Sequence, residues 1–338
     1  MESLIIWTII FLISILGLVK GADWLLKGSE KIGLAIGLSP FIVGVLIVSL
    51  GTSFPELIAS FFAAYKGLTE FAPANAVGSN LANILLVVGF SAVVAGRLVA
   101  TKSLINTELP LLAIGTAIFL AVAWDGIITF FEAIIMLLVY VIYILYAFKD
   151  GDKNNNKEVE KLPSRADRRD HTSHLSMKEC HKNRPVERPS LKINDMMMFV
   201  IGVAILGISS KYLVDSVISL SVILGMGVGA ITITAVAIGT SLPELLVSIK
   251  AALMKRFDVA LGNIFGSNAF NMMVVVGLPA LFFRVELDDQ TYSVGLPFLA
   301  IATFLFVLSG ISKNINSWEG AFYVLFYVIF ISALLGFS

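Results

Sequence analysis

The chain has 338 residues, of which 57% are hydrophobic and 14% are charged, against about 25% charged in soluble globular domains. These values exclude an ordinary soluble globule and indicate a protein that lies in a lipid bilayer. The 24 basic and 24 acidic residues balance, which gives no argument for a nucleic-acid partner, and a single cysteine excludes an internal disulfide framework.

Apolar intervals long enough to cross about 30 Å of hydrocarbon as helices recur along the whole sequence. We therefore predict an all-α polytopic membrane protein with ten transmembrane helices. The first span has no basic segment before it and no cleavage pattern after it, so we expect a retained helix. In chain order, the predicted spans are 3–25, 37–65, 71–96, 105–124, 127–148, 194–218, 224–254, 258–283, 291–311 and 316–337.

One polar segment divides these spans into two groups of five. Residues 149–192 hold 12 basic and 8 acidic residues, which leaves 28 charges for the other 294 positions. The expected organisation is an N-terminal five-helix unit over 1–148, a hydrophilic loop over 149–193 and a C-terminal five-helix unit over 194–338.

The positions of Lys and Arg predict the orientation in the membrane. With the polar loop on the inner side, 21 of these residues lie inside and 3 lie outside, and without the loop the ratio is still 9 to 3. Cytosolic segments carry an excess of Lys and Arg. We therefore expect an integral protein of the cell (plasma) membrane, with a cytosolic loop and both termini outside.

The sequence contains an internal repeat at a constant offset of 188 residues. The copies are five predicted crossings apart, an odd number, so they run in opposite directions through the bilayer. Such inverted repeats form substrate sites near mid-membrane, where the two halves meet. Gly51-Thr52-Ser53-Phe54-Pro55-Glu56-Leu57 recurs as Gly239-Thr240-Ser241-Leu242-Pro243-Glu244-Leu245, and Asn75, Gly78-Ser79-Asn80 and Asn83 recur as Asn263, Gly266-Ser267-Asn268 and Asn271, within regions 44–89 and 232–277.

The proline in each copy predicts a broken helix at the midplane. Pro55 has no N–H for the carbonyl of Gly51 and its ring clashes there, so we expect the helix to open around Gly51-Thr52-Ser53. Free carbonyls in hydrocarbon require protein, water or a cation as partner. Glu56 and Glu244 would then lie in the first turn of the restarted helices, where the helix dipole favours a carboxylate.

Glu56 and Glu244 are the deepest acids, since charge-free runs of 24 and 28 residues precede them. Acidic residues inside a membrane are costly and indicate function, and two that meet across an inverted repeat need cations or protons. Ca²⁺ prefers six to eight oxygen ligands, which the two carboxylates and the freed carbonyls of Thr52 and Thr240 would supply in part.

Further polar groups in both copies suit a second, monovalent cation. Asn83 and Asn271 lie one turn beyond the second serine of each copy and can point an amide oxygen at the same centre. Neutral hydroxyl oxygens, which can coordinate Na⁺, come from Ser53, Ser79, Ser241 and Ser267.

These paired motifs resemble the two alpha-repeats of the calcium/cation antiporter superfamily, most closely its prokaryotic-type sodium/calcium exchangers. The resemblance covers nearly the whole chain. It implies a central divalent site made by Glu56, Glu244 and the carbonyls of Thr52 and Thr240. It also implies flanking Na⁺ sites that use the four serines and the backbone at Ser49 and Ala237. Asn at both positions 83 and 271, where the potassium-dependent branch carries Asp, argues against potassium co-transport.

We therefore expect a secondary antiporter that exchanges Na⁺ for Ca²⁺ by alternating access, and not an enzyme. The expected partners are these two ions and the bilayer, with no cofactor and no obligate protein partner. The alternative is a Ca²⁺/H⁺ antiporter of the same fold, although proton-coupled relatives typically show Gly-Asn before Pro-Glu. A cation channel is a more distant alternative, because channels usually gather a filter from four repeats or subunits.

Overall fold

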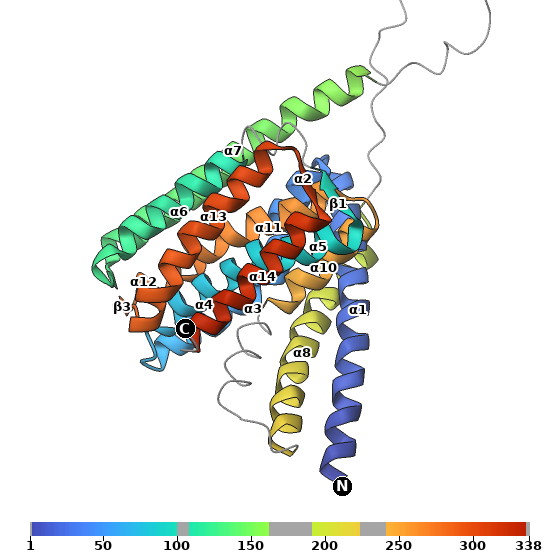
Figure 1. Cartoon of the computed structure of the whole chain (residues 1–338). Helices are drawn as coiled ribbons and strands as arrows, with labels where there is room; N and C mark the ends of the chain where they lie inside the picture. Colours follow the sequence, from blue (N-terminus) through green and yellow to red (C-terminus); the bar gives the residue numbers. More distant parts are fainter. Residues whose placement is uncertain (1, 100–107, 162–190, 224–240, 336–338) are drawn as a thin grey trace, which may run out of the picture.

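Helices dominate the computed structural model, which describes residues 2–99, 108–161, 191–223 and 241–335 (Figure 1). This helical content confirms the expectation of a helical membrane protein. The α-helices are α1 (Glu2–Ile36), α2 (Pro40–Ile42), α3 (Ser49–Tyr65), α4 (Phe71–Leu81), α5 (Val88–Ala95), α6 (Leu109–Val122), α7 (Phe130–Lys161), α8 (Ile193–Ile223), α10 (Leu242–Leu253), α11 (Phe257–Phe270), α12 (Gly277–Ala280), α13 (Leu296–Ile311) and α14 (Ser317–Leu334).

Among the described residues, eight helical segments are long and apolar enough to cross a membrane, and Leu109–Asp125 is a shorter apolar helix. The predicted span 224–254 is described only from residue 241 onward, where it contains α10. The eight segments are Leu4–Ile36, Pro40–Tyr65, Phe71–Ala95, Phe130–Phe148, Ile193–Leu213, Phe257–Ala280, Thr291–Ile311 and Ser317–Leu334.

Two helices continue more than ten residues beyond their predicted ends. α1 continues to Ile36 instead of ending near residue 25, and its 35 residues correspond to about 52 Å at about 1.5 Å per residue. α7 continues to Lys161, so the predicted loop 149–193 begins within a helix. Both corrections have one cause: the predicted spans end before a charged segment, whereas backbone hydrogen bonding continues through charged residues.

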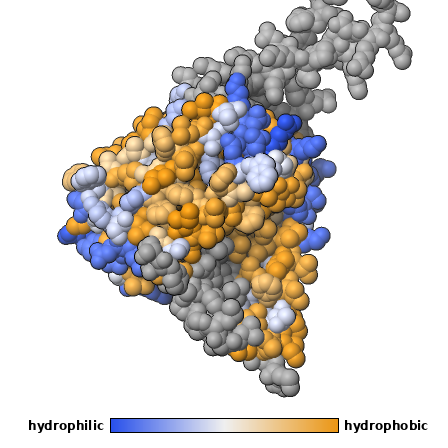
Figure 2. Space-filling view, viewed as in Figure 1, coloured by the Kyte–Doolittle hydropathy of each residue, from blue (hydrophilic) through white to orange (hydrophobic). Residues whose placement is uncertain are grey.

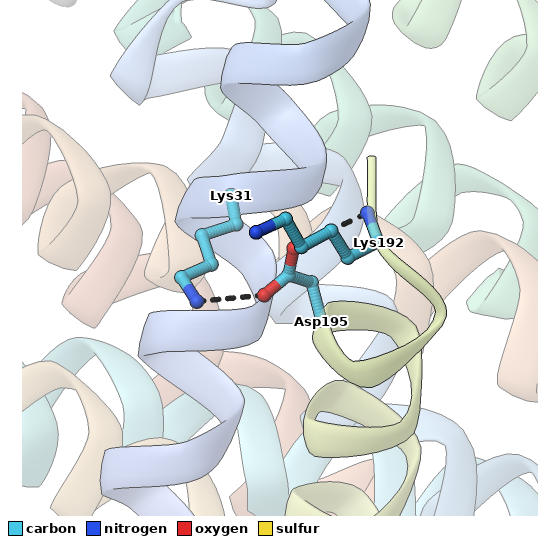
Figure 3. A network of polar contacts seen from close by, with 3 residues as sticks. All are labelled: Lys31, Lys192 and Asp195. Carbon is cyan, nitrogen blue, oxygen red and sulfur yellow. Dashed lines mark hydrogen bonds and ion pairs between the residues drawn. The ribbon is translucent and has the colours of Figure 1, made fainter. Parts of the chain in front are cut away.

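The charged end of α1 is held by ion pairs with the second half of the chain. Asp23 lies 2.5 Å from Lys250 of α10, and Glu30 lies 2.6 Å from Arg256. Figure 3 shows Lys31 beside Asp195 of α8, with 2.6 Å between Nζ and Oδ1, while the backbone N–H of Lys192 donates to the other carboxylate oxygen. These pairs allow charged residues to remain in a helix next to the membrane.

α1 and α8 lie side by side and antiparallel (Figure 1). Gly17 faces Ser209, whereas Gly28, further along α1, faces Phe199, which lies earlier in α8. A methyl group added at Gly28 would lie 2.7 Å from the backbone nitrogen of Phe199. Small residues therefore allow these backbones to approach closely, as is typical of helix pairs in membranes.

Two short antiparallel sheets join the two halves and correct the expectation of a purely helical chain. β1 (Arg97–Val99) pairs with β4 (Asn314–Asn316), and β2 (Ile127–Ile128) pairs with β3 (Val285–Glu286). Strands of two or three residues are too short for an alternating pattern to reveal in sequence. β1 and β3 begin 188 residues apart, which is the offset of the sequence repeat.

The helix that carries Pro55 does not open where the sequence predicted. α3 is helical through Gly51, Thr52 and Ser53, and the irregularity lies just before it, in wide π-type turns over Val43–Val48. Local π-type adjustment is one way in which membrane helices accommodate proline. Glu56 therefore lies inside α3 and not in a first turn. In the second copy α10 begins at Leu242, so Glu244 lies in a first turn as predicted.

Burial separates an interior from a lipid-facing exterior. Exposed apolar side chains lie on outer helices, among them Leu16 on α1, Phe131 on α7 and Phe322 on α14. Figure 2 shows a largely hydrophobic surface on the viewed face, with hydrophilic residues gathered toward its edges. Nearly all of α11 is buried. The described structure is that of an integral membrane protein, and its polar residues in the interior mark the candidate site.

Candidate ion-binding site

Glu56 and Glu244 occupy the interior of the molecule. Glu56 comes from α3 and Glu244 from α10, and their exposed fractions are 2% and 1%. α3 and α10 pack against each other, and the carboxylate of Glu244 contacts Ser53, which lies three residues before Glu56 on α3. The deepest acids of the sequence thus come together between the two halves of the chain and away from lipid.

The carboxylates receive little help from protein donors. Ser53 donates a 2.8 Å hydrogen bond to Oε1 of Glu244. Both oxygens of Glu56 and Oε2 of Glu244 have no hydrogen-bond partner among the described residues. Burial of charged oxygens without partners costs several kcal/mol, so this arrangement requires a cation or a proton. Carboxylate oxygens are the ligands that hard cations such as Ca²⁺ prefer.

The other predicted site residues that the structure describes are buried as well. The hydroxyls of Ser241 and Ser267 have no partner among the described residues, and Ser49 donates to the carbonyl of Val45. The exposed fractions are 0% for Ser49, Ser53, Asn83 and Ser267, 1% for Thr52, Ser241 and Asn271, and 2% for Ser79. Thr240 and Ala237 lie outside the described residues.

Asn83 and Asn271 share an unusual backbone setting. Asn83 lies in the π-type turns of Ala82–Val87, and Asn271 begins those of Asn271–Val275. Both atoms of each side-chain amide lack a partner among the described residues. Wide helical turns of this kind occur frequently at functional sites, because they change the direction of the side chains around them.

A close approach of backbones places α11 against the first half. A methyl group at Gly44 would lie 2.6 Å from the carbonyl oxygen of Val259, and one at Gly262 would lie 2.6 Å from that of Phe41. Only glycine fits at such distances. These two glycines bring the helix that carries Ser267 next to the turns that precede α3.

The structure also reveals a set of amides to which the sequence reasoning assigned no role. Asn75 donates to Ser60 at 3.1 Å, and Asn263 donates to Ser248 at 2.9 Å. Asn80 donates to the backbone carbonyl of Asn268 at 3.1 Å, from one half to the other. The signal was present in the sequence, because each of these asparagines recurs at the 188-residue offset.

Comparison with known proteins assigns the family. The model of the family described as sodium/calcium exchanger protein matches residues 6–149 and 195–336. Sodium/calcium exchanger MaX1 of Methanosarcina acetivorans is 30% identical, over 97% of this chain and 99% of its own length. Inner membrane protein YrbG of Escherichia coli is 30% identical over 89% of this chain and 87% of its own.

A solved structure agrees with the sequence relatives. The sodium-calcium exchanger NCX_Mj, soaked with zero Na⁺ and Ca²⁺, superposes with a TM-score of 0.78 at 26% identity, over 98% of this chain and 99% of that one. The likeness therefore extends over both halves of the molecule. By its sequence motifs, its family match and its fold, this chain belongs to the sodium/calcium exchanger protein family.

Proposed function

We propose that this exchanger moves Na⁺ and Ca²⁺ in opposite directions through the buried centre between Glu56 and Glu244. The observation that carries the proposal is the pair of buried glutamates, one from each half, with three carboxylate oxygens that lack donors among the described residues. The names of MaX1 and NCX_Mj, both described as sodium/calcium exchangers, support the choice of ions.

In this proposal Ca²⁺ binds to Glu56, Glu244 and the carbonyls of Thr52 and Thr240. Na⁺ uses neutral oxygens around the same centre, because a monovalent ion needs less negative charge than a dication. The buried hydroxyls and amides without partners support this division. The proposed Na⁺ ligands are Ser53, Ser79, Ser241, Ser267, the amides of Asn83 and Asn271, and the backbone at Ser49 and Ala237.

The proposed architecture has ten crossings in two inverted five-helix units, residues 1–148 and 194–338. The antiparallel packing of α1 and α8 supports it, because these helices begin the two units. The sheets support it as well, since the 188-residue offset relates β1 to β3 and β2 to β4. We place the 149–193 loop in the cytosol, both termini outside and the protein in the cell membrane, on the distribution of Lys and Arg.

Competition between the ions would couple their movements. The two carboxylates repel each other when no cation is bound, and binding of either Ca²⁺ or Na⁺ removes that repulsion. A bundle whose centre is neutralised can move between inward-open and outward-open states, whereas a bare pair of buried charges opposes the movement. Because the carboxylates cannot fully bind both ions at once, one ion enters only as the other leaves.

Transport in sealed vesicles tests the function. Purified protein is reconstituted into vesicles loaded with Na⁺ and diluted into Na⁺-free buffer with labelled Ca²⁺. We expect uptake that disappears when Na⁺ is present equally on both sides. Uptake driven equally well by a pH gradient without Na⁺ would favour Ca²⁺/H⁺ exchange. Uptake without saturation or counterflow would favour a channel.

A further inference from the structure

Two buried hydrogen bonds occupy equivalent places in the two halves. Asn263 on α11 donates to Ser248 on α10 at 2.9 Å, and Asn75 on α4 donates to Ser60 on α3 at 3.1 Å. Asn263, Ser248 and Ser60 are fully buried, and Asn75 is half-buried. Both the amide and the hydroxyl recur at the offset of 188 residues, so the whole bond is duplicated.

The place of each bond along its helices is informative. Ser60 follows Glu56 by four residues, and Ser248 follows Glu244 by four. Asn75 precedes Ser79 by four residues, and Asn263 precedes Ser267 by four. Four residues are about one helical turn, so each bond lies one turn from a proposed ligand on both helices that it joins.

In the second copy the bond continues into the other half of the chain. The side-chain oxygen of Asn263 lies 3.3 Å from the hydroxyl of Thr52, which is also 3.2 Å from the carbonyl of Ser49. In the first copy the amide of Asn75 lies 3.5 Å from the carbonyl of Glu56. Both side chains thus contact the backbone or side chain of residues that bear proposed ligands.

Asparagine is suited to this position because its amide both donates and accepts. Asn263 uses its NH₂ group toward Ser248 and its oxygen toward Thr52. A carboxylate of the same shape would lose the donor and add charge, and an apolar residue would lose both bonds. Loss of an outer group that holds a metal ligand in place typically lowers metal affinity about 10- to 100-fold.

We propose that Asn263 with Ser248, and Asn75 with Ser60, are positioning residues for ion binding. Each bond holds the glutamate helix and the serine helix of one half in a fixed register, so that carboxylate and hydroxyl oxygens reach the same ion. Neither asparagine touches the ion. This inference rests on the proposed function, because it concerns the same buried centre.

Calcium binding by the purified full-length protein in detergent tests the inference. Ser248→Ala and Ser60→Ala each remove one hydroxyl with little change in volume, and Asn263→Ala removes both bonds of its amide. Isothermal titration with Ca²⁺ in Na⁺-free buffer should show affinity weakened about 10-fold in each variant. The midpoint of thermal unfolding without ions should stay within about 3 degrees of that of the unmodified protein.

A double variant separates positioning from general loosening. Ser248→Ala combined with Asn263→Ala should bind Ca²⁺ no more weakly than Asn263→Ala alone, because both changes break one shared bond. The matched control is Ser91→Ala, which removes a buried hydroxyl on α5 without a partner among the described residues and should leave affinity unchanged. If Asn263→Ala fails to fold, the two serine variants decide the result.

The outcomes distinguish this inference from the function on which it rests. Unmodified protein that binds no Ca²⁺ would overturn the proposed function and this inference with it. Normal binding by the unmodified protein together with unchanged affinity in Ser248→Ala and Ser60→Ala would overturn the positioning role alone. A parallel loss of affinity and thermal stability in both serine variants would also overturn it, since the bonds would then be merely structural.

Discussion

Ser53 donates a 2.8 Å hydrogen bond to Oε1 of Glu244, a residue 191 positions away. A hydroxyl of the first half thereby binds a carboxylate of the second half. Ser53 lies on the same helix as Glu56, three residues before it. The corresponding hydroxyl of the second half, Ser241, has no partner among the described residues. The two halves therefore share one centre, but they contribute to it unequally in this conformation.

Ser53→Ala should weaken binding of both ions without abolishing insertion in the membrane. The change removes a hydroxyl that we propose as a Na⁺ ligand and that donates a 2.8 Å hydrogen bond to Glu244. We expect the Na⁺ concentration that half-maximally drives Ca²⁺ uptake to rise about 10-fold, in the range expected for the loss of one charge-assisted hydrogen bond. Uptake in reconstituted vesicles at several Na⁺ gradients measures this value. An unchanged Na⁺ dependence would remove Ser53 from the site.

Glu56→Gln and Glu244→Gln should each abolish Na⁺-driven Ca²⁺ uptake. Glutamine keeps the shape of the side chain but removes the negative charge that Ca²⁺ requires at a buried site. The variants should insert normally, because a neutral amide is less costly in the membrane interior than a carboxylate. Ca²⁺ uptake per amount of reconstituted protein is the measurement. Robust uptake by either variant would contradict the central role of the pair.

Gly262→Ala should destabilise the protein, whereas Gly115→Ala should be tolerated. A methyl group at Gly262 would lie 2.6 Å from the carbonyl oxygen of Phe41, but at Gly115 the nearest atom is 3.7 Å away. Forcing a group into a closely packed interior typically costs about 1–3 kcal/mol. Thermal unfolding of the detergent-purified variants compares the two sites. Equal stability of both variants would show that α11 does not require its close approach to the first half.

The two small sheets should lie on opposite sides of the membrane. Arg97 of β1 and Asp125, just before β2, are both exposed. One predicted membrane span, residues 105–124, separates them, so the predicted topology places Arg97 on the cytosolic side and Asp125 outside. In a Cys180→Ser background, Arg97→Cys should react with an impermeant maleimide only from the cytosolic side and Asp125→Cys only from outside. Labelling of intact cells and of inverted vesicles gives the comparison. Reaction of both positions from the same side would refute the inverted topology.

Much of the fold could be predicted because apolar residues favour lipid and charged residues favour water, whatever the rest of the chain does. Runs without charge marked most membrane helices, and the 188-residue repeat identified Glu56 and Glu244 as a pair. Two kinds of feature escaped this reasoning. α1 and α7 continue past their predicted ends, and each strand pairs with a partner from the other half of the chain. Such pairings depend on distant residues, which no local pattern records.

Pro55 illustrates the same limit within a single helix. The loss of a hydrogen-bond donor was predictable, but the place where the helix adjusts was not. The wide turns lie at Val43–Val48, where Gly44 meets α11, and not at Gly51. Helices become irregular at prolines but also at glycines and π-type turns, so a proline in the sequence does not by itself fix where the irregularity lies.

The amino-acid sequence by itself indicated that this protein lies in lipid, and its repeated motifs pointed to the family. Only the tertiary structure decided that Ser53 donates to Glu244 and that Asn263 connects Ser248 with Thr52. The physical reason is that solvent preference belongs to each residue, whereas a buried hydrogen bond requires two distant segments to meet within about 3 Å.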